Sequence, residues 1–554
     1  VPLANLGCEP PQPTPPANNT GQNGGEQDPD PNEDEGESEG GIVNTANSIT
    51  SVPGGTRVDP EGVAPPGDVN LITWKDSRGA DRTMTLGAYL YQYDFSFDDG
   101  TQIVSRSAND DAYGHEGFGY VVSHNTQNGN SPLGKANAPT KVETIVLAGG
   151  HHAIHRVELL YDRDKEAGGM GIKIPVVIEW LVATGRDHPV WAVTWKMDEA
   201  TNVRNVSFDT YRMDVRGPYG SLNFDGAANR NAGDAIGGVA WGDFGLKFRT
   251  TDAQLTMNSP WVYNEANSVC FTHTWTANTN AEMGIVQTKA GDKEMGYQDR
   301  VLGRERGSTS AEMYTDKGNC NAFGDARVYS MPCINGWPYQ LMNFDWADGA
   351  GKPLDEATGT KLIAWGSPYG WLGSSSFPNF DYSANVDGRG DRSYATFIVL
   401  GPKARLNPNT GLFDGPGDVQ QVIGAVEALS KATLTASVGT VVTQVPRGPG
   451  ASQLKTIVNG YNDTYAAYYV SAADNAATFT LTPAAGTVIQ NPIFIVQNWT
   501  SSTLPKISMD GTSLTVNTGT ASSGAFVSVN ADAQELWVTI NQTIAAATEF
   551  QVTP

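Results

Sequence analysis

The sequence predicts a mainly β protein, in which a large antiparallel β-sandwich is followed by a small C-terminal β-sandwich. Short runs rich in β-branched and aromatic residues recur from about residue 68 to residue 400, each bounded by Gly, Pro, Asn or Asp. The 62 glycines and 32 prolines suit many turns between short strands. Helical periodicity is scarce, and Asp418–Leu429 carries the one convincing amphipathic pattern.

The expected elements follow one another in this order. In the first part of the chain the strand-like segments are Thr83–Tyr93, Gly119–Ser123, Val142–Leu147, Ile174–Trp180, His188–Trp195, Phe244–Phe248 and Ser393–Leu400. The helix of Asp418–Leu429 comes next, and Asp418 could cap it. Beyond about residue 432 the strand-like segments are Ala477–Thr482, Pro492–Gln497 and Glu535–Ile540.

With 554 residues the chain is too long for one ordinary core, and we expect four segments. Residues 1–55 form an acidic, Pro-rich arm that is disordered or extended, because residues 9 to about 40 offer almost nothing to bury. Residues 56–415 form the large sandwich and 416–431 a connector helix. Residues 432–554, rich in Thr, Ala, Val and Ser, form a separate small antiparallel sandwich.

The charge of the chain limits its partners. Its net charge is −24, whereas nucleic-acid binding needs a basic surface, so we expect no nucleic-acid partner. The same charge argues against anionic membrane surfaces. No apolar run approaches the roughly 18 residues of a membrane-spanning helix, so we expect no transmembrane segment.

The cysteines point to the cell exterior. Cys8 lies in a context that resembles a bacterial lipoprotein processing site, although Asn5 and Leu6 depart from the usual pattern; a disulfide or a free thiol is the alternative to a lipid anchor. Cys320 and Cys333 enclose a short Gly/Asn-rich segment, which predicts a local disulfide and an oxidising compartment. Cys270 suits a buried small hydrophobe or a bond to Cys8. We therefore expect an extracellular or cell-surface protein, lipid-anchored if Cys8 is modified.

Three of the seven histidines lie within five residues, at His151, His152 and His155. Imidazole titrates near neutral pH and is a common metal ligand, so these residues are candidates for proton transfer or metal binding. On an extended strand His151 and His155 share one face while His152 takes the other, so the three could not act together. In the competing interpretation, one histidine lies in the core, one caps a turn and one is exposed.

Three passages resemble the galactose-mutarotase-like β-supersandwich of secreted carbohydrate-active proteins, especially polysaccharide lyases. They are Ile178–Trp191, Arg216–Gly220 and Gly390–Gly401. The resemblance concerns organisation over most of the chain, and no family catalytic motif is matched residue by residue. It implies a large sandwich followed by a small β domain and a polysaccharide partner. The helical toroid of many such lyases has no counterpart here, which argues against a deep, tunnel-like cleft.

A lyase removes a proton next to a uronate carboxyl group, so it needs a base, an acid for the leaving oxygen and a cation for the carboxylate. His151, His152 or His155 could be the base, and Tyr219 the acid or the base. Arg216 or Arg156 could neutralise the carboxylate. We therefore predict β-elimination on an acidic glycan. A hydrolase would instead need a carboxylate pair, with no basis for choosing one among these residues: Glu179, Asp187, Asp209, Asp225 and Asp243.

Two further groups suggest binding sites. Trp337, Tyr339, Tyr369 and Trp371 lie among Gly, Pro and Ser and suit sugar stacking, with ordinary core packing as the alternative. The carboxylates and amide of Asp381, Asn385, Asp387 and Asp391 partly resemble a calcium loop. Because an acidic residue at the twelfth position is missing, a simple Asp/Asn turn competes with a structural calcium site.

Two non-enzymatic classes remain open. One is a surface or filament-forming structural protein that self-assembles through its N-terminal arm, in which Gly41–Val52 has the alternation of a donated strand. The other is a carbohydrate-binding adhesin, which would bind glycans and release no product.

Overall fold

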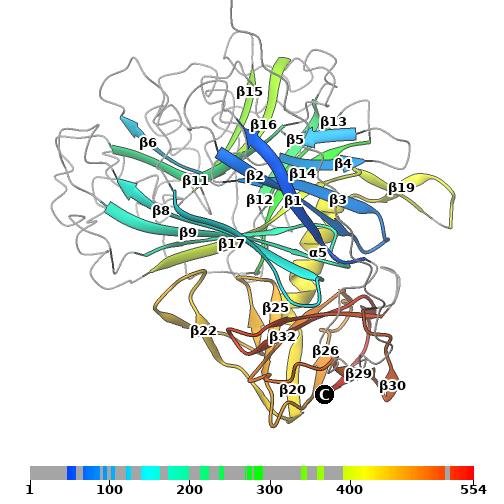
Figure 1. Cartoon of the computed structure of the whole chain (residues 1–554). Helices are drawn as coiled ribbons and strands as arrows, with labels where there is room; N and C mark the ends of the chain where they lie inside the picture. Colours follow the sequence, from blue (N-terminus) through cyan, green and yellow to red (C-terminus); the bar gives the residue numbers. More distant parts are fainter. Residues whose placement is uncertain are drawn as a thin grey trace, which may run out of the picture. The chain divides into compact units, whose positions relative to one another are not determined.

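Figure 1 presents the computed structural model of the chain. It describes residues 47–57, 67–87, 92–96, 102–105, 120–125, 139–162, 173–196, 199, 213–223, 236–242, 269, 271–276, 280–290, 339–345, 358–366, 391–407, 409–517 and 524–554. The described part is mainly β, which confirms the predicted fold class.

The first sheet contains five strands in sequence order: β1 (Thr50–Arg57), β2 (Gly67–Lys75), β3 (Asp81–Gly87), β4 (Gln92–Ser96) and β5 (Gln102–Ser105). Its inner face is apolar at alternate positions, with Ile72 and Trp74 on β2 fully or almost fully buried, as a one-sided sheet requires. Thr50, Ser51 and Val52 pair with β2 of the same chain. These three residues of the segment expected to be donated to a neighbour are therefore used internally.

The largest sheet is antiparallel throughout. Its order is β12 (Ile236–Gly242), β13 (Phe271–Thr276), β14 (Glu282–Gln287), β17 (Arg392–Gly401), β10 (Val190–Trp195), β9 (Lys173–Ala183), β8 (His152–Asp162) and β7 (Pro139–Val146). The sequence of β9 is apolar at nearly every position, and both of its faces are buried from Val176 to Ala183. Trp180 on β9 packs edge-on against its partner Trp191 on β10, with ring centroids 6.5 Å apart.

A third, four-stranded sheet has the order β15 (Tyr339–Asp345), β16 (Thr358–Gly366), β11 (Met213–Asn223) and β6 (Tyr120–Asn125). All of its pairs are antiparallel. The register between β6 and β11 shifts between Arg216 and Tyr219, next to Gly217-Pro218. A proline cannot donate to the ladder, so it belongs at such a bulge.

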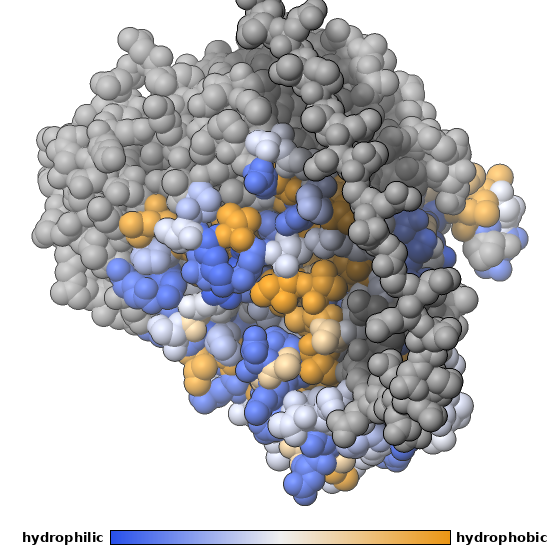
Figure 2. Space-filling view, viewed as in Figure 1, coloured by the Kyte–Doolittle hydropathy of each residue, from blue (hydrophilic) through white to orange (hydrophobic). Residues whose placement is uncertain are grey.

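The hairpin of β18 (Ala404–Leu406) and β19 (Phe413–Pro416) precedes the helix α5 (Asp418–Lys431). Leu412 and Phe413 are 63% and 62% exposed, and Figure 2 shows apolar residues at this end of the molecule. The helix occupies the segment for which an amphipathic pattern predicts it. The expected cap was wrong: Gly417 is the N-cap and Asp418 the first helical residue. Oε1 of Glu282 on β14 accepts the hydrogen bond of the Val419 N–H instead, at 2.7 Å.

The strands after α5 form two facing sheets. One contains β20 (Thr433–Val438), β26 (Ala477–Thr482), β34 (Thr548–Thr553), β29 (Lys506–Met509) and β30 (Thr512–Ser513). The other contains β21 (Thr440–Val441), β25 (Ala467–Ser471), β28 (Ile493–Gln497), β32 (Glu535–Ile540) and β31 (Ala525–Asn530), with β24 (Tyr461–Asn462) beside β25. The strands β22 (Gln444–Pro446) and β23 (Leu454–Thr456) form a short hairpin. The strands β27 (Ile489–Gln490) and β33 (Thr543–Ile544), which are far apart in the sequence, form a separate antiparallel pair. Because β25 and β28 are parallel, the sandwich is not wholly antiparallel as expected.

One apolar core joins these strands to the largest sheet. Phe494 contacts both Phe479 and Phe550 of the facing sheet, with ring centroids 4.7 and 5.0 Å apart. The same cluster continues through Val419 and Val426 of α5 to Phe397 on β17. The helix therefore contributes its apolar face to a core shared by the strands before and after it.

Candidate functional site

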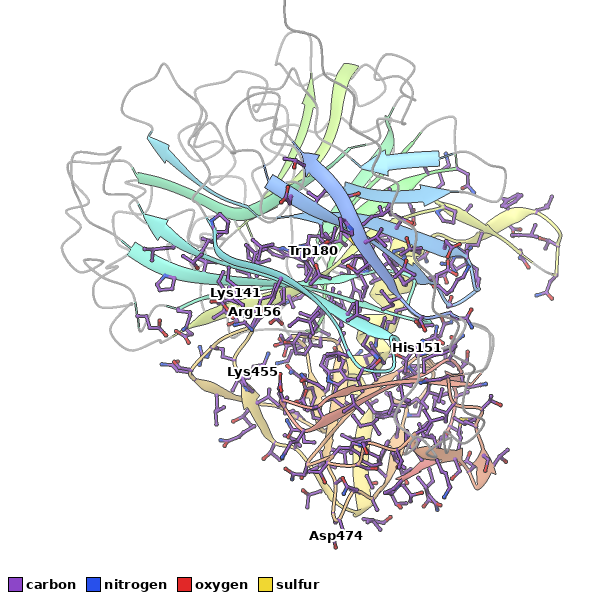
Figure 3. The ribbon with its side chains drawn as sticks, in the orientation of Figure 1. Lys141, His151, Arg156, Trp180, Lys455 and Asp474 are labelled. Atoms are coloured by element: carbon purple, nitrogen blue, oxygen red, sulfur yellow. The ribbon has the colours of Figure 1, made fainter. Side chains whose placement is uncertain are left out.

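The three clustered histidines lie where the β7–β8 hairpin meets the C-terminal strands. Gly149 and Gly150 both have positive φ, which lets the chain reverse before His151. Ala148 then forms a β-bridge with Val529 of β31. Figure 3 shows His151 at this tip. His151 and His152 are fully buried and His155 is 1% exposed, so the expected mixture of core, cap and exposed histidines was wrong.

Each imidazole is held by nearby polar groups. Nδ1 of His151 lies 3.1 Å from Oγ1 of Thr184. The two nitrogens of His152 lie 3.1 Å from Oγ of Ser528 and 2.8 Å from Oγ1 of Thr539. These hydroxyls belong to β31 and β32, so His152 links the largest sheet to the C-terminal strands.

The hydrogen bonds of His155 fit a neutral imidazole. Its Nε2 lies 3.1 Å from the carbonyl oxygen of Gly87, so Nε2 carries the proton and donates it. Its Nδ1, 2.8 Å from Oγ1 of Thr144, then accepts from that hydroxyl. Burial lowers the pKa of both His151 and His155 to about 4, and burial with the neighbouring His151 lowers that of His152 well below its usual value. Because the three side chains are buried, neutral and hydrogen-bonded, we interpret them as packing residues.

Arg156 belongs to a partly buried polar cluster, in which Glu179 is the buried member. Its guanidinium contacts Oε1 of Glu179 at 2.9 Å and Oε1 of Glu158 at 2.8 Å. Oε2 of Glu179 accepts a hydrogen bond of 2.5 Å from the hydroxyl of Tyr465. Burial outweighs these partners and raises the pKa of Glu179. Glu179, one of the carboxylates considered for hydrolysis, thus joins β9 to the segment before β25.

The four-stranded sheet brings two predicted catalytic residues together. Arg216 on β11 pairs with Val122 on β6, and Tyr219 pairs with Tyr120. Val122 and Tyr120 are two residues apart and therefore occupy positions on one face of β6. Without the bulge, residues 216 and 219 would fall on opposite faces; with it, both occupy register positions on the same face.

The same face carries residues that sequence reasoning missed. His124 pairs with Asp214, one alternate position along from Arg216, so both belong to this face. The period-two spacing of Tyr120, Val122 and His124 was the available signal. On the other side of β11, Gly220 pairs with Trp365, and Tyr339 pairs with Gly366 next to it. By this register, Tyr339, Gly366, Tyr219 and Tyr120 form one row across the sheet.

A second cluster of charged side chains surrounds a cavity of about 70 Å³. Arg186, Asp187 and His188, in the turn between β9 and β10, line it together with Arg405 and Asp418. Oδ1 of Asp418 contacts Nη2 of Arg405 at 2.6 Å, and its Oδ2 lies 3.1 Å from Nε2 of His188. Among them, the sequence suggested only Asp187 as a candidate site residue, while Asp418 was expected as a helix cap. The signal was a charged Arg-Asp-His triplet inside an apolar stretch.

The electrostatics of this cluster follow from burial. Burial lowers the pKa of His188, and Asp418 offsets part of that effect, so the imidazole is neutral at pH 7. Burial alone would raise the pKa of Asp418, but His188, Arg405 and Arg82 outweigh it and lower the pKa. Asp187 behaves likewise: Arg82, His188 and Arg405 lower its pKa, and its Oδ1 accepts from the Ser77 N–H at 2.9 Å. Both carboxylates are therefore anionic at neutral pH.

Other predicted site residues are placed as follows. Asp391 is buried, and its Oδ2 accepts a hydrogen bond of 3.1 Å from the Ser452 N–H in the β22–β23 loop. Several predicted residues lie outside the described residues: Cys8, Asp209, Asp225, Asp243, Cys270, Cys320, Cys333, Trp337, Tyr369, Trp371, Asp381, Asn385 and Asp387. Within the described ranges, no group of three or more His, Cys, Asp or Glu residues could hold a metal ion.

Comparisons with protein-family models and with curated proteins gave no match for this chain. The one helix in the described part of the chain is too short to be a candidate for crossing a membrane.

Proposed function

We propose that this protein is an extracellular or cell-surface polysaccharide-processing enzyme that cleaves an acidic glycan by β-elimination on the β6–β11 face. The observation that carries the proposal is the register at the β11 bulge. It gives one face a tyrosine, an arginine and a histidine–aspartate pair, at Tyr219, Arg216, His124 and Asp214. These are the residue types that a base, an acid and a carboxylate-neutralising cation require.

The spacing on this face suits a sugar ring. Successive same-face positions along a strand are about 7 Å apart. Arg216 occupies the middle position, with the His124–Asp214 row on one side and the Tyr219–Tyr120 row on the other. With the carboxylate of a uronate at Arg216, the carbon that bears this carboxylate would lie toward the His124–Asp214 row. The glycosidic oxygen would lie toward the Tyr219–Tyr120 row.

In the proposed reaction, His124 takes the proton from the carbon beside the carboxyl group. The electron pair of that C–H bond forms a carbon–carbon double bond, and the bond from the neighbouring carbon to the glycosidic oxygen breaks. Tyr219 donates its proton to the leaving oxygen. Arg216 stabilises the negative charge that develops on the carboxylate, and Asp214 orients the imidazole.

The row of Tyr339, Tyr219 and Tyr120 supports a glycan partner. Tyr219 and Tyr120 occupy paired positions on the neighbouring strands β11 and β6, and Tyr339 pairs with Gly366 in the same row. A row of aromatic residues is a suitable platform for sugar rings. Tyr339, which the sequence suggested for sugar stacking, is therefore included in the proposed binding face.

The direct test is incubation of the protein with a panel of acidic and neutral polysaccharides, with and without calcium. Ultraviolet absorbance of unsaturated uronides and new reducing ends are followed together. The proposal expects both to rise on at least one acidic glycan, and to fall together in Arg216→Lys. Ser123→Ala is the matched control, because Ser123 pairs with Val215 on the opposite face. Reducing ends without unsaturation would indicate hydrolysis, and binding without product would indicate an adhesin. The absence of both product and binding would favour a structural protein.

A further inference from the structure

The cavity between α5 and the β9–β10 turn is lined by Arg186, a buried arginine that forms no ion pair with a carboxylate within the described residues. Arg186 is 9% exposed, and burial lowers its pKa to about 10, so it stays charged at neutral pH. Its Nη2 donates to the carbonyl of Ala466 at 2.9 Å and its Nε to that of Asn491 at 3.3 Å. Within the described part of the chain it forms no ion pair, and its Nη1 has no hydrogen-bond partner.

The carbonyl oxygens that hold Arg186 come from an unusual backbone. Ala466 and Asn491 both have positive φ, at 50° and 47°. A non-glycine residue in this region is strained, more so for alanine than for asparagine. The guanidinium is therefore fixed in place beside the ring of Phe397, 5.8 Å from its centroid. This is a preorganised cation at the wall of a cavity.

A second arginine faces the same cavity. Nε and Nη2 of Arg405 are used by Asp418 and Asp187, whereas its Nη1 contacts no hydrogen-bond acceptor among the described residues. The cavity is lined by two arginines, Arg186 and Arg405, and by two carboxylates, Asp187 and Asp418. Both carboxylates contact Arg405. Arg186 is therefore the lining cation whose charge no carboxylate contacts within the described residues.

We propose that this cavity binds the carboxylate group of a small organic acid or of a uronate. Two guanidinium groups with an open Nη1 provide charge-assisted donors for carboxylate oxygens. Val422 and Ala425 of α5 form an apolar wall for the rest of the ligand. The cavity, at about 70 Å³, is roughly half the volume of an engineered 150 Å³ cavity that holds benzene, so it fits a carboxylate and one or two carbons. This site is independent of the proposed β-elimination, because it uses none of the β6–β11 residues.

The test is isothermal titration calorimetry of the full chain with acetate, glucuronate and, as the neutral match, glucose. Saturable binding of acetate and glucuronate without glucose supports a site for carboxylates in general. Binding of glucuronate alone supports a uronate site. The proposal is overturned if neither acetate nor glucuronate binds saturably, or if glucose binds as tightly as they do.

Two variants locate the site without removing a charged group. Ala425→Leu fills the cavity from the helix and is expected to weaken binding at least about tenfold, because the ligand loses its space. Gln420→Leu adds a similar apolar side chain at an exposed position of the same helix and is expected to bind like the wild type. Equal affinity of the two variants would overturn the assignment to this cavity. Circular dichroism confirms that both variants are folded.

Discussion

Nε2 of His152 lies 2.8 Å from Oγ1 of Thr539, a residue 387 positions further along the chain. The ring also packs against Trp537, with centroids 5.7 Å apart. A histidine that begins β8 is thus part of the contact between the largest sheet and the C-terminal strands. We therefore interpret the cluster of His151, His152 and His155 as packing residues, and we assign the proposed proton transfer to His124.

Replacing His152 with alanine should destabilise the fold. The substitution removes two hydrogen bonds and leaves a cavity beside Trp537, which together cost about 2–4 kcal/mol. Urea unfolding followed by tryptophan fluorescence measures the loss. Lys141→Ala, at a 49% exposed side chain on β7, serves as the comparison and should change little. Equal midpoints for the two variants would contradict the packing role.

The buried histidines should make stability depend on pH. The pKa of His151 and His155 is about 4 in the folded protein against 6.5 in the unfolded chain, so the unfolded state binds more protons between these values. Stability is therefore fully present above about pH 6.5 and is lost as pH falls toward about 4, by up to about 3 kcal/mol per histidine. Glu179 and Glu535, whose pKa values burial raises, act in the opposite direction.

The measurement is the free energy of unfolding in urea across this pH range, for the wild type and His155→Gln. Glutamine can keep one donor and one acceptor but does not titrate. The variant should show a shallower slope between about pH 4 and about pH 6.5. An unchanged slope would show that His155 is not buried as a neutral group.

Asp418→Asn should weaken the anchor of α5. The carboxylate contacts Arg405, His188 and Arg82, so the change leaves buried cations with less compensation, at a cost of about 3–5 kcal/mol. Glu427→Gln breaks the i,i+4 pair with Lys431 near the other end of the helix and should cost less than about 0.5 kcal/mol. Thermal unfolding midpoints compare the two. If the two variants lower the unfolding midpoint by a similar small amount, the contacts of Asp418 do not stabilise the helix as expected.

The local elements were predictable because their patterns are local. The apolar run of β9 and the 3.6-residue period of α5 both lie within one stretch of sequence. The cap of α5 was not predictable, because its acceptor, Glu282, lies 137 residues away from Val419 on another strand. Asp418 has the right chemistry for a cap, but its carboxylate contacts Arg82, His188 and Arg405 instead.

The proposed site shows the same division. Arg216 and Tyr219 were selected by residue type, but three residues apart on a regular strand they would face opposite sides. The bulge that brings them to one face depends on pairing with β6, about 90 residues earlier in the chain. The sequence pattern likewise favoured His151, His152 and His155 over His124, because it shows clustering and not burial.

The contact between Glu179 and Tyr465 should be worth measurable stability. Tyr465→Phe leaves Oε2 of the buried carboxylate without this donor, which costs about 1–3 kcal/mol. In Glu179→Gln the tyrosine should matter less, so a double-mutant cycle should give a coupling of about 1 kcal/mol or more. Additive effects in urea unfolding would indicate that the hydroxyl makes no net contribution.

We propose that the reacting imidazole belongs to His124 and that the three clustered histidines are structural. The most direct measurement is kcat for unsaturated-uronide release on the best acidic glycan, comparing His124→Asn with His155→Asn at matched folded fractions. We expect His124→Asn to lower kcat by about 10²- to 10⁴-fold, as loss of a general base does. His155→Asn should lower the unfolding midpoint and leave kcat within about twofold of the wild type, because its ring is buried against Gly87 and Thr144. The reverse pattern, or the absence of unsaturated product from every acidic glycan, would contradict this account.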